Sequence, residues 1–208
     1  MVTKNIGIVL YPDFEELDAI GPYEVFGMLG KIDREWRVLT IAATAEPVAS
    51  LSGLKVLPDF TFEDAPPLDV ILLPGGLGSR QAMDDSRLVE YVRKTGESAG
   101  WVTSVCTGAM LLHRAGLLHG RRATTHWGAI DELRNMGEVT VLDDARWVVD
   151  GNVVTSAGVS AGIDMALYLI SLLKDVETAK AVQKMMEYYP KPPEFEGPAT
   201  EGVEAATG

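Results

Sequence analysis

Short, continuous runs of apolar and β-branched residues recur along the chain, and polar stretches with a different spacing separate them. The runs lie at 5–11, 36–43, 69–76 and 101–105. Strands that are buried on both faces of a parallel sheet show such runs, because neither face meets water. Parallel strands also need crossover helices between them. The pattern therefore predicts an α/β fold in which helices cover both faces of a mostly parallel sheet.

The stretches between these runs carry apolar residues at helical spacing. Helices are predicted over 17–29, over 84–96, from 107 onward, over 159–173 and over 176–188. The first helix contains Gly21-Pro22. We expect it to break or restart there, because proline lacks an amide hydrogen and crowds the preceding turn.

Three further β segments and a distinct C-terminal stretch complete the pattern. An excursion is predicted over 47–57, a strand at 123–127, and a hairpin around Asp150-Gly151 between two apolar runs. Residues 190–208 are rich in Pro, Gly and Glu and have no periodic apolar face, so we predict a flexible tail or a strap on a partner surface. No internal repeat is apparent, and a single α/β domain is predicted over residues 1–189.

Composition and charge narrow the class of partner. The 208 residues are 47% hydrophobic and 23% charged, which is typical of a globular protein. Thirty acidic and eighteen basic residues give a net charge of −12. Such a field repels phosphate backbones and anionic lipid, so we expect neither nucleic acid nor a membrane as a partner. A small-molecule substrate is the alternative that the charge leaves open.

The N-terminal residues argue against a secreted protein, and the cysteine and histidine residues argue against a metalloprotein. The start reads MVTKNIGIVLYPDFEE, which has neither the length nor the flanks of a signal peptide, so we expect a cytoplasmic protein. The single cysteine cannot form an internal disulfide. The three histidines, His113, His119 and His126, show no zinc-ligand spacing. We therefore predict no metal and no cofactor.

The single cysteine, Cys106, lies where an apolar strand ends at Val105 and a helix is predicted to begin at Thr107. Residues at such turns project beyond the carboxyl ends of parallel strands, where ligands bind in open sheets. The setting resembles a nucleophile elbow. A helix N-terminus favours negative charge, so we expect a lowered thiol pKa and a nucleophilic sulfur. The alternative is a core cysteine that fills space.

The groups that could act with the thiol are a histidine or a carboxylate. Thr107, not histidine, follows Cys106, and the missing local Cys-His pair argues against a peptidase, which must expel an amine. His126 could approach from the next strand end or be an ordinary strand-end histidine. Acidic residues follow the first strand, and any of them could meet Cys106 at the same sheet edge: Glu15, Glu16 and Asp18.

Backbone amides offer a third component of the site. Gly75 and Gly76 close the third apolar run, and their amides could face the same crevice as an anion-stabilising pocket. The alternative is a plain strand-ending turn. The glycines at 75, 76 and 78 are a weak dinucleotide signal, since Gln81 stands where a third glycine or alanine is needed.

These motifs in combination resemble the ThiJ/PfpI superfamily and, within it, the isocyanide hydratase branch. The resemblance rests on LDAIGP at 17–22, DVILLPGG at 69–76, SVCTG at 104–108, AGLLHGRRATTHW at 115–127 and SAGVSAGIDMALYL at 156–169. The resemblance implies a flavodoxin-like three-layer sandwich that forms homodimers. Sensor domains of some AraC-type regulators share two of these motifs, but they continue into a helix-turn-helix region.

The resemblance assigns roles to individual residues. Cys106 matches the family nucleophile, Asp18 matches the acid that is hydrogen-bonded to it in isocyanide hydratases, and Thr107 matches the threonine after that cysteine. Gly75 and Gly76 match the backbone pocket. Two apolar residues are expected to line the substrate site, with core packing as the alternative for each: Trp127 and Val159.

The function that the resemblance implies is hydration of an isocyanide to an N-substituted formamide through a thioimidate on Cys106. Two alternatives remain open. A glyoxalase or deglycase of the same superfamily would use Cys106 on an aldehyde, although aspartate at position 18 and Thr107 disfavour it. A non-catalytic sensor would bind a ligand here or oxidise Cys106 as a redox switch.

Overall fold

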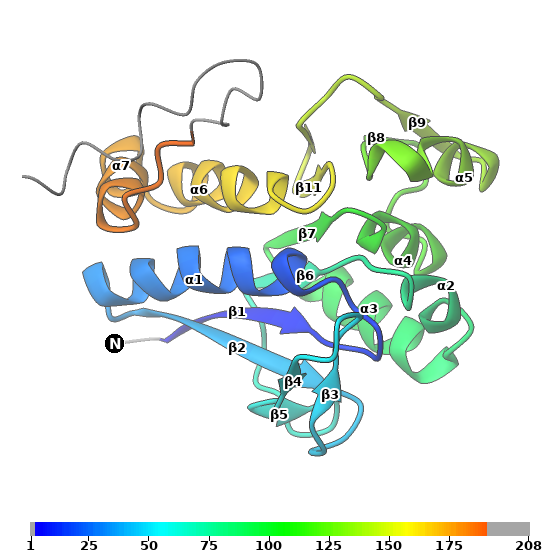
Figure 1. The fold of residues 1–208 in the computed structure, drawn as a ribbon, viewed down its shortest axis with the longest axis horizontal. Helices are drawn as coiled ribbons and strands as arrows, with labels where there is room; N and C mark the ends of the chain where they lie inside the picture. The colour runs from blue at the N-terminus through cyan, green and yellow to red at the C-terminus, as the bar shows by residue number, and fades with distance from the viewer. Residues whose placement is uncertain (1–2, 191–208) are drawn as a thin grey trace, which may run out of the picture.

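A seven-stranded sheet forms the centre of the structure (Figure 1), which is a computed structural model that describes residues 3–190. Its strand order is β10–β11–β7–β6–β1–β2–β5. All neighbouring pairs are parallel except β10–β11. The predicted, mostly parallel α/β sheet is therefore confirmed. The strands are β1 (Lys4–Val9), β2 (Trp36–Ala42), β5 (Phe60–Thr61), β6 (Val70–Leu73), β7 (Trp101–Val105), β10 (Trp147–Asp150) and β11 (Val153–Ser156).

Two small sheets flank the central one. The antiparallel pair β3 (Val48–Ala49) and β4 (Lys55–Val56) confirms the excursion predicted over 47–57. The strand predicted at 123–127 is displaced: β8 (Arg121–Ala123) starts earlier and pairs with β9 (Val139–Val141). The chain leaves the strand because His126 Nδ1 accepts a hydrogen bond from the Gly128 amide and caps the short helix η1 (Trp127–Ala129).

Helices cover both faces of the central sheet. Figure 1 shows α1, α6 and α7 lying together on one side. The chain moves from β1 to β2 and from β6 to β7 in opposite directions along the sheet, so right-handed crossovers place α1 and α3 on opposite faces. The helices are α1 (Glu16–Ile32), α2 (Ser79–Ala82), α3 (Ser86–Ser98), α4 (Gly108–Arg114), α5 (Ile130–Asn135), α6 (Ala161–Leu173) and α7 (Val176–Met185).

The predicted break at Gly21-Pro22 is wrong, because α1 runs through both residues without interruption. Both are buried where α1 packs on α6. A Cβ added to Gly21 would lie 2.9 Å from Ile163 Cγ1, and one added to Gly162 would lie 3.3 Å from Pro22 Cγ. This close packing offsets the roughly 3 kcal/mol that proline costs a helix interior. Tertiary contact therefore overrides local propensity here.

The core lies on both sides of the central strands. Every residue of β6 and β11 is buried, and so are the last five residues of β1. The strand register aligns Leu73 with Ser104 and Ser156 with Val105, so β6, β7 and β11 end at one edge of the sheet. The segments that follow these strands meet there, and this edge carries the candidate site.

Two sequence expectations concern features beyond this core. The predicted tail over 190–208 lies outside the described residues except for Pro190. Within residues 3–190, none of the helices combines the length and the apolar character that crossing a lipid bilayer requires.

The different surroundings of Gly162 and Gly27 predict opposite effects for two glycine substitutions. Gly162→Ala should lower the free energy of unfolding by about 1–3 kcal/mol, because the new methyl would meet Val105 at 2.9 Å. Gly27→Ala should raise it by about 0.5–1 kcal/mol, since no atom lies within 4 Å of a Cβ there. Urea unfolding of both variants checks this. Equal effects would mean that Gly162 is not close-packed against Val105 and Pro22.

Candidate active site

Cys106 occupies a strained turn between β7 and α4. Its φ is +56°, in the left-handed region that non-glycine residues rarely adopt. The surrounding chain holds this conformation: the Cys106 amide donates to the carbonyls of Ser156 and Ala157, at 3.2 and 3.3 Å, and Thr125 Oγ1 donates to the Cys106 carbonyl at 2.8 Å. The strand-to-helix turn thus has the geometry predicted for a nucleophile elbow.

Asp18 lies in the first turn of α1 and is completely buried. Its Oδ2 accepts a hydrogen bond from the Gly75 amide at 2.9 Å. Its Oδ1 has no hydrogen-bond partner among the described residues. A buried, unpartnered carboxylate oxygen is costly, whereas a protonated one is a donor available to a thiol or a substrate. When Asp18 is protonated, Oδ1 is therefore the oxygen that holds the proton.

Gly75 and Gly76 allow three segments to touch at this edge of the sheet. A Cβ on Gly75 would lie 2.5 Å from the Thr107 amide nitrogen and 2.8 Å from Cys106 Cβ. Gly76 has a φ of +121°, and a Cβ there would lie 2.4 Å from the Glu15 nitrogen. Any side chain would push the turn after β6 away from Cys106 and from the start of α1. The two glycines therefore set the distance between the thiol and the acid.

The amides of these glycines differ from the open anion pocket that the sequence suggests. The Gly75 amide donates to Asp18, and the Gly76 amide donates to Thr107 Oγ1 at 3.0 Å. Thr107 Oγ1 also accepts from Ser79 Oγ at 3.0 Å. Both amides thus position protein groups: one orients the acid and the other anchors the residue after the nucleophile.

Burial raises the pKa of both reactive groups. The pKa of Asp18 rises to about 7, mainly through burial, while the Gly75 amide opposes the shift. The pKa of the Cys106 thiol rises to about 12, because of burial first and the negative charge of Asp18 second. The expectation of a lowered thiol pKa is therefore wrong. The Thr107 amide does favour the thiolate, but desolvation outweighs it.

The two acidic residues that precede Asp18, Glu15 and Glu16, have different roles. Glu16 accepts hydrogen bonds from Ser50 Oγ and the Ser52 amide, which hold the β3–β4 hairpin against α1. The bond from Ser50 is the main reason that the pKa of Glu16 falls to about 2. Glu15 carries a negative charge that adds to the rise in the pKa of Asp18. Only Asp18 is both buried and next to the thiol.

The two predicted lining residues lie in different environments. Val159 is half-buried in the loop before α6 with a φ of +50°, and its amide acts on Asp18 by lowering the pKa. Trp127 is 82% exposed and packs against the His126 ring, with centroids 5.3 Å apart. Val159 thus adjoins the acid, whereas Trp127 faces outward in the single chain.

Tyr11 is a site residue that sequence reasoning missed. It lies two residues after the last residue of β1 and is buried, and its hydroxyl donates to the Pro74 carbonyl at 2.5 Å. Asp18 and Cys106 both act on its pKa. Its position near the carboxyl end of the first strand is the sequence feature that could have identified it, since Asp18 was selected for following the same strand.

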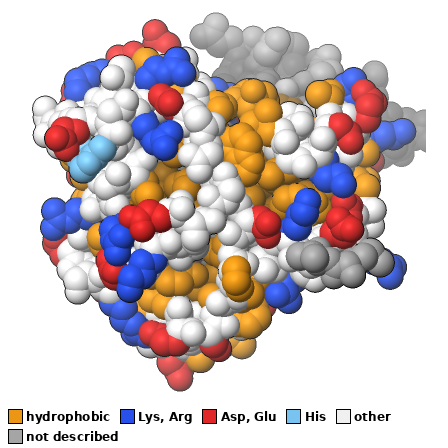
Figure 2. Space-filling view, turned by 180° about the vertical axis from the view of Figure 1, so that it is seen from behind, with side chains coloured by type: hydrophobic (Ala, Val, Ile, Leu, Met, Phe, Trp, Pro, Cys, Tyr) orange, Lys and Arg blue, Asp and Glu red, His pale blue; other side chains and the backbone are white. Residues whose placement is uncertain are grey.

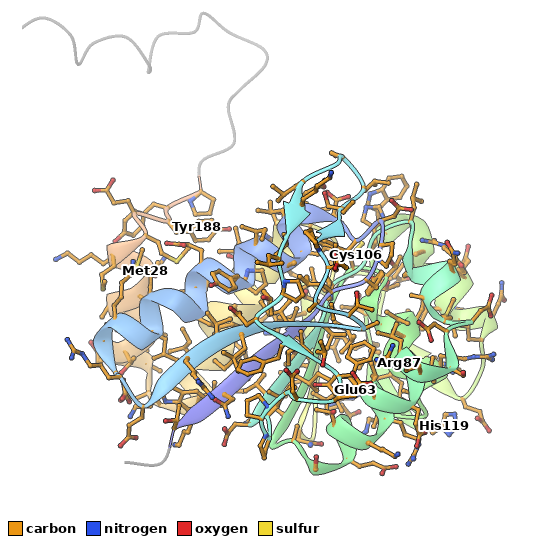
Figure 3. The ribbon with its side chains drawn as sticks, turned by 90° about the horizontal axis from the view of Figure 1, so that it is seen from below. Met28, Glu63, Arg87, Cys106, His119 and Tyr188 are labelled. Atoms are coloured by element: carbon orange, nitrogen blue, oxygen red, sulfur yellow. The ribbon has the colours of Figure 1, made fainter. Side chains whose placement is uncertain are left out.

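The histidines lie apart from this arrangement or have structural tasks. His119 pairs with Glu138 at 3.3 Å and lies well away from Cys106 (Figure 3). His113 Nε2 bonds to the Gly137 carbonyl at 2.7 Å. In the part of the chain that the structure describes, no group of three or more His, Cys, Asp or Glu side chains could hold a metal ion.

Comparisons with known proteins agree with this fold. Residues 4–172 match the DJ-1/PfpI family, and the chain belongs to that family. The chain is 45% identical to isonitrile hydratase of Pseudomonas putida over 191 residues, which cover 91% of this chain and 80% of that protein. It is 33% identical to the Parkinson disease protein 7 homolog of Danio rerio, over 88% of this chain and 96% of that protein.

A solved structure shows the same architecture. The crystal structure of a ThiJ/PfpI family protein from Pseudomonas syringae superposes with a TM-score of 0.86 at 36% identity, covering 95% of this chain and 80% of that one. The flavodoxin-like α/β fold expected from the motifs is therefore confirmed.

The raised pKa of Asp18 predicts a pH-dependent cost to stability. The unfolded carboxyl titrates near 4 and the folded one near 7, so the folded state binds more protons between these values and loses stability as pH rises. Asp18→Asn should remove this loss. Between pH 4 and pH 8, the free energy of unfolding of the variant, measured with urea, should increase by about 2–4 kcal/mol relative to that of the wild type. A pH-independent difference would contradict the assignment.

Proposed function

We propose that this protein is a cysteine-dependent isocyanide hydratase, which converts R–N≡C and water to the formamide R–NH–CHO. One observation carries the proposal: the only cysteine of the chain lies on a strained turn beside a buried carboxyl whose pKa is about 7. The identity of 45% with isonitrile hydratase, another name for isocyanide hydratase, supports the same chemistry.

The first half of the reaction adds the thiol to the terminal carbon of the isocyanide. Asp18 accepts the thiol proton as Cys106 Sγ attacks that carbon, and the same carboxyl then delivers the proton to it. The S–H bond breaks, S–C and C–H bonds form, and a thioimidate, R–N=CH–S–Cys106, results. A carboxyl with a pKa near 7 can both take and give this proton at neutral pH.

The second half hydrolyses the thioimidate. Asp18 helps water to add its hydroxyl to carbon while nitrogen gains a proton. The tetrahedral adduct then collapses, the C–S bond breaks, the formamide leaves and the thiol regains its proton. The leaving group is a thiolate and not an amine, so the cycle needs no histidine as a strong general acid. The absence of a histidine after Cys106 fits this chemistry.

The roles of the surrounding residues are part of the proposal. Thr107 and the Gly75 and Gly76 amides hold the acid and the nucleophile in register. Val159 lines the substrate site next to Asp18, and Trp127 flanks its outer side. We assign no cofactor and no metal, since each proton and bond in the cycle is accounted for by Cys106, Asp18 and water.

We further propose a cytoplasmic homodimer. A nucleophilic thiol must stay reduced, which the cytoplasm ensures. Exposed leucines gather around the hairpin that Glu16 holds against α1: Leu17, Leu51 and Leu54, each 38–47% exposed. Hydrophobic side chains also form a broad band on the face seen in Figure 2. Apolar surface of this kind is suited to a second copy of the chain.

Replacing the nucleophile tests the covalent mechanism. Cys106→Ser should reduce formamide production from an alkyl or aryl isocyanide at least a thousandfold, because a hydroxyl is a far weaker nucleophile than a thiolate. Mass spectrometry of the wild type during turnover should detect the thioimidate on Cys106. Full activity of the variant, or wild-type turnover of methylglyoxal without any formamide, would reject the hydratase.

The pH profile tests the role of the acid. The reactive state of the pair holds one proton, shared between thiol and carboxyl, and it forms as pH rises through the pKa of Asp18. The kcat/KM should therefore rise about tenfold per pH unit below pH 7 and level off above it. Asp18→Asn should cost at least a hundredfold and abolish the inflection. An unchanged profile in that variant would exclude Asp18 as the proton carrier.

A further inference from the structure

The buried hydroxyl of Tyr11 is connected to the acid through one peptide group. Tyr11 Oη donates to the Pro74 carbonyl at 2.5 Å, and the Gly75 amide donates to Asp18 Oδ2 at 2.9 Å. The Pro74 carbonyl and the Gly75 amide belong to the same planar unit. Two hydrogen bonds, one at each end of a single rigid peptide group, therefore connect the phenol of Tyr11 to the carboxyl of Asp18.

We propose that Tyr11 is a positioning residue, which fixes and polarises the Pro74–Gly75 peptide so that its amide holds Asp18 in the orientation that catalysis requires. This inference rests on the proposed function and adds a residue to the same site. Tyr11 acts through the peptide and not on the substrate.

Two physical effects support this role. A planar peptide cannot turn its amide away from Asp18 without also breaking the bond from Tyr11, so the phenol restrains the donor. Donation to the carbonyl also polarises the peptide and strengthens its N–H as a donor, because hydrogen bonds in series reinforce one another in a low-dielectric interior. Burial raises the pKa of Tyr11 well above its usual value, so the phenol remains a donor.

The charges around the acid set the direction of the expected change. Asp18 faces the thiol of Cys106 and the negative charge of Glu15, while Tyr11 is also influenced by Arg80. The Gly75 amide lowers the pKa of Asp18, against the effect of burial. Weakening this amide as a donor must therefore raise the pKa of Asp18.

Tyr11→Phe removes the hydroxyl and keeps the ring. Since Cys106 is the only cysteine, the rate of its alkylation by iodoacetamide reports the thiol–acid pair without any isocyanide. We expect the lower midpoint of the rate–pH curve to rise by about half a unit. We expect kcat for formamide formation to fall about tenfold, as for one lost hydrogen bond to a buried group, with little change in KM.

Two controls separate positioning from a general structural effect. Tyr91→Phe alters a half-buried tyrosine on α3, stacked on Phe62 at 4.4 Å, and should leave both readouts unchanged. Asp18→Asn removes the lower midpoint, and in that background Tyr11→Phe should leave the rate–pH curve unchanged, because Tyr11 acts only through Asp18. Should Tyr11→Phe not fold, 3-fluorotyrosine at position 11 replaces it: the stronger donor should move the midpoint down.

The results of these experiments distinguish the positioning role of Tyr11 from the proposed hydratase function. A shifted midpoint in Tyr11→Phe supports the positioning role, even if the wild type forms no formamide and the proposed function fails. An unshifted midpoint, or a change of the rate–pH curve by Tyr11→Phe in the Asp18→Asn background, overturns the positioning role and leaves the hydratase assignment to its own test.

Discussion

A carboxyl group that leaves water for a packed interior must find enough donors to stay charged, or else take up a proton. Asp18 is completely buried and receives one strong hydrogen bond, from the Gly75 amide, while its second oxygen has no partner in the described chain. Its pKa consequently rises to about 7. The proposed chemistry depends on this one constraint, since it makes the acid a reversible proton carrier at neutral pH.

The fold buries Asp18 next to the thiol by bringing segments that are distant in the sequence to one edge of the sheet. Asp18 follows β1, Gly75 follows β6, Cys106 follows β7 and Val159 follows β11. Glycines at the points of contact let the backbones approach without side chains between them. The strained φ angles of Cys106 and Val159 lie in this same region. Local strain and a buried acid reduce stability, and the large core of the parallel sheet offsets that cost.

Much of this arrangement could be predicted from the sequence, because it rests on patterns that are local in the chain. Continuous apolar runs gave the parallel strands, and the position of Cys106 after such a run gave the turn. The resemblance to a known family singled out Asp18 from Glu15 and Glu16. What could not be predicted depends on packing. Pro22 stays helical because α6 covers it, and the thiol pKa rises because burial outweighs the helix start.

Tyr11 and the two glycine amides escaped prediction for a related reason. A tyrosine at the end of an apolar strand looks like core, and its hydrogen bond to Pro74 exists only once β1 and β6 are neighbours. The amides of Gly75 and Gly76 suggested an anion pocket, yet their partners are Asp18 and Thr107. Which donor meets which acceptor is a property of the folded edge, and no spacing in the sequence encodes it.

The central claim is that Asp18 takes up and releases a proton near neutral pH beside the nucleophile. Carbon-13 NMR of protein labelled at the aspartate carboxyls measures this directly, with the Asp18 signal identified by its absence from Asp18→Asn. The account predicts that the Asp18 carboxyl titrates near pH 7 in the resting enzyme. A titration near pH 4, the usual value for aspartate, would contradict it.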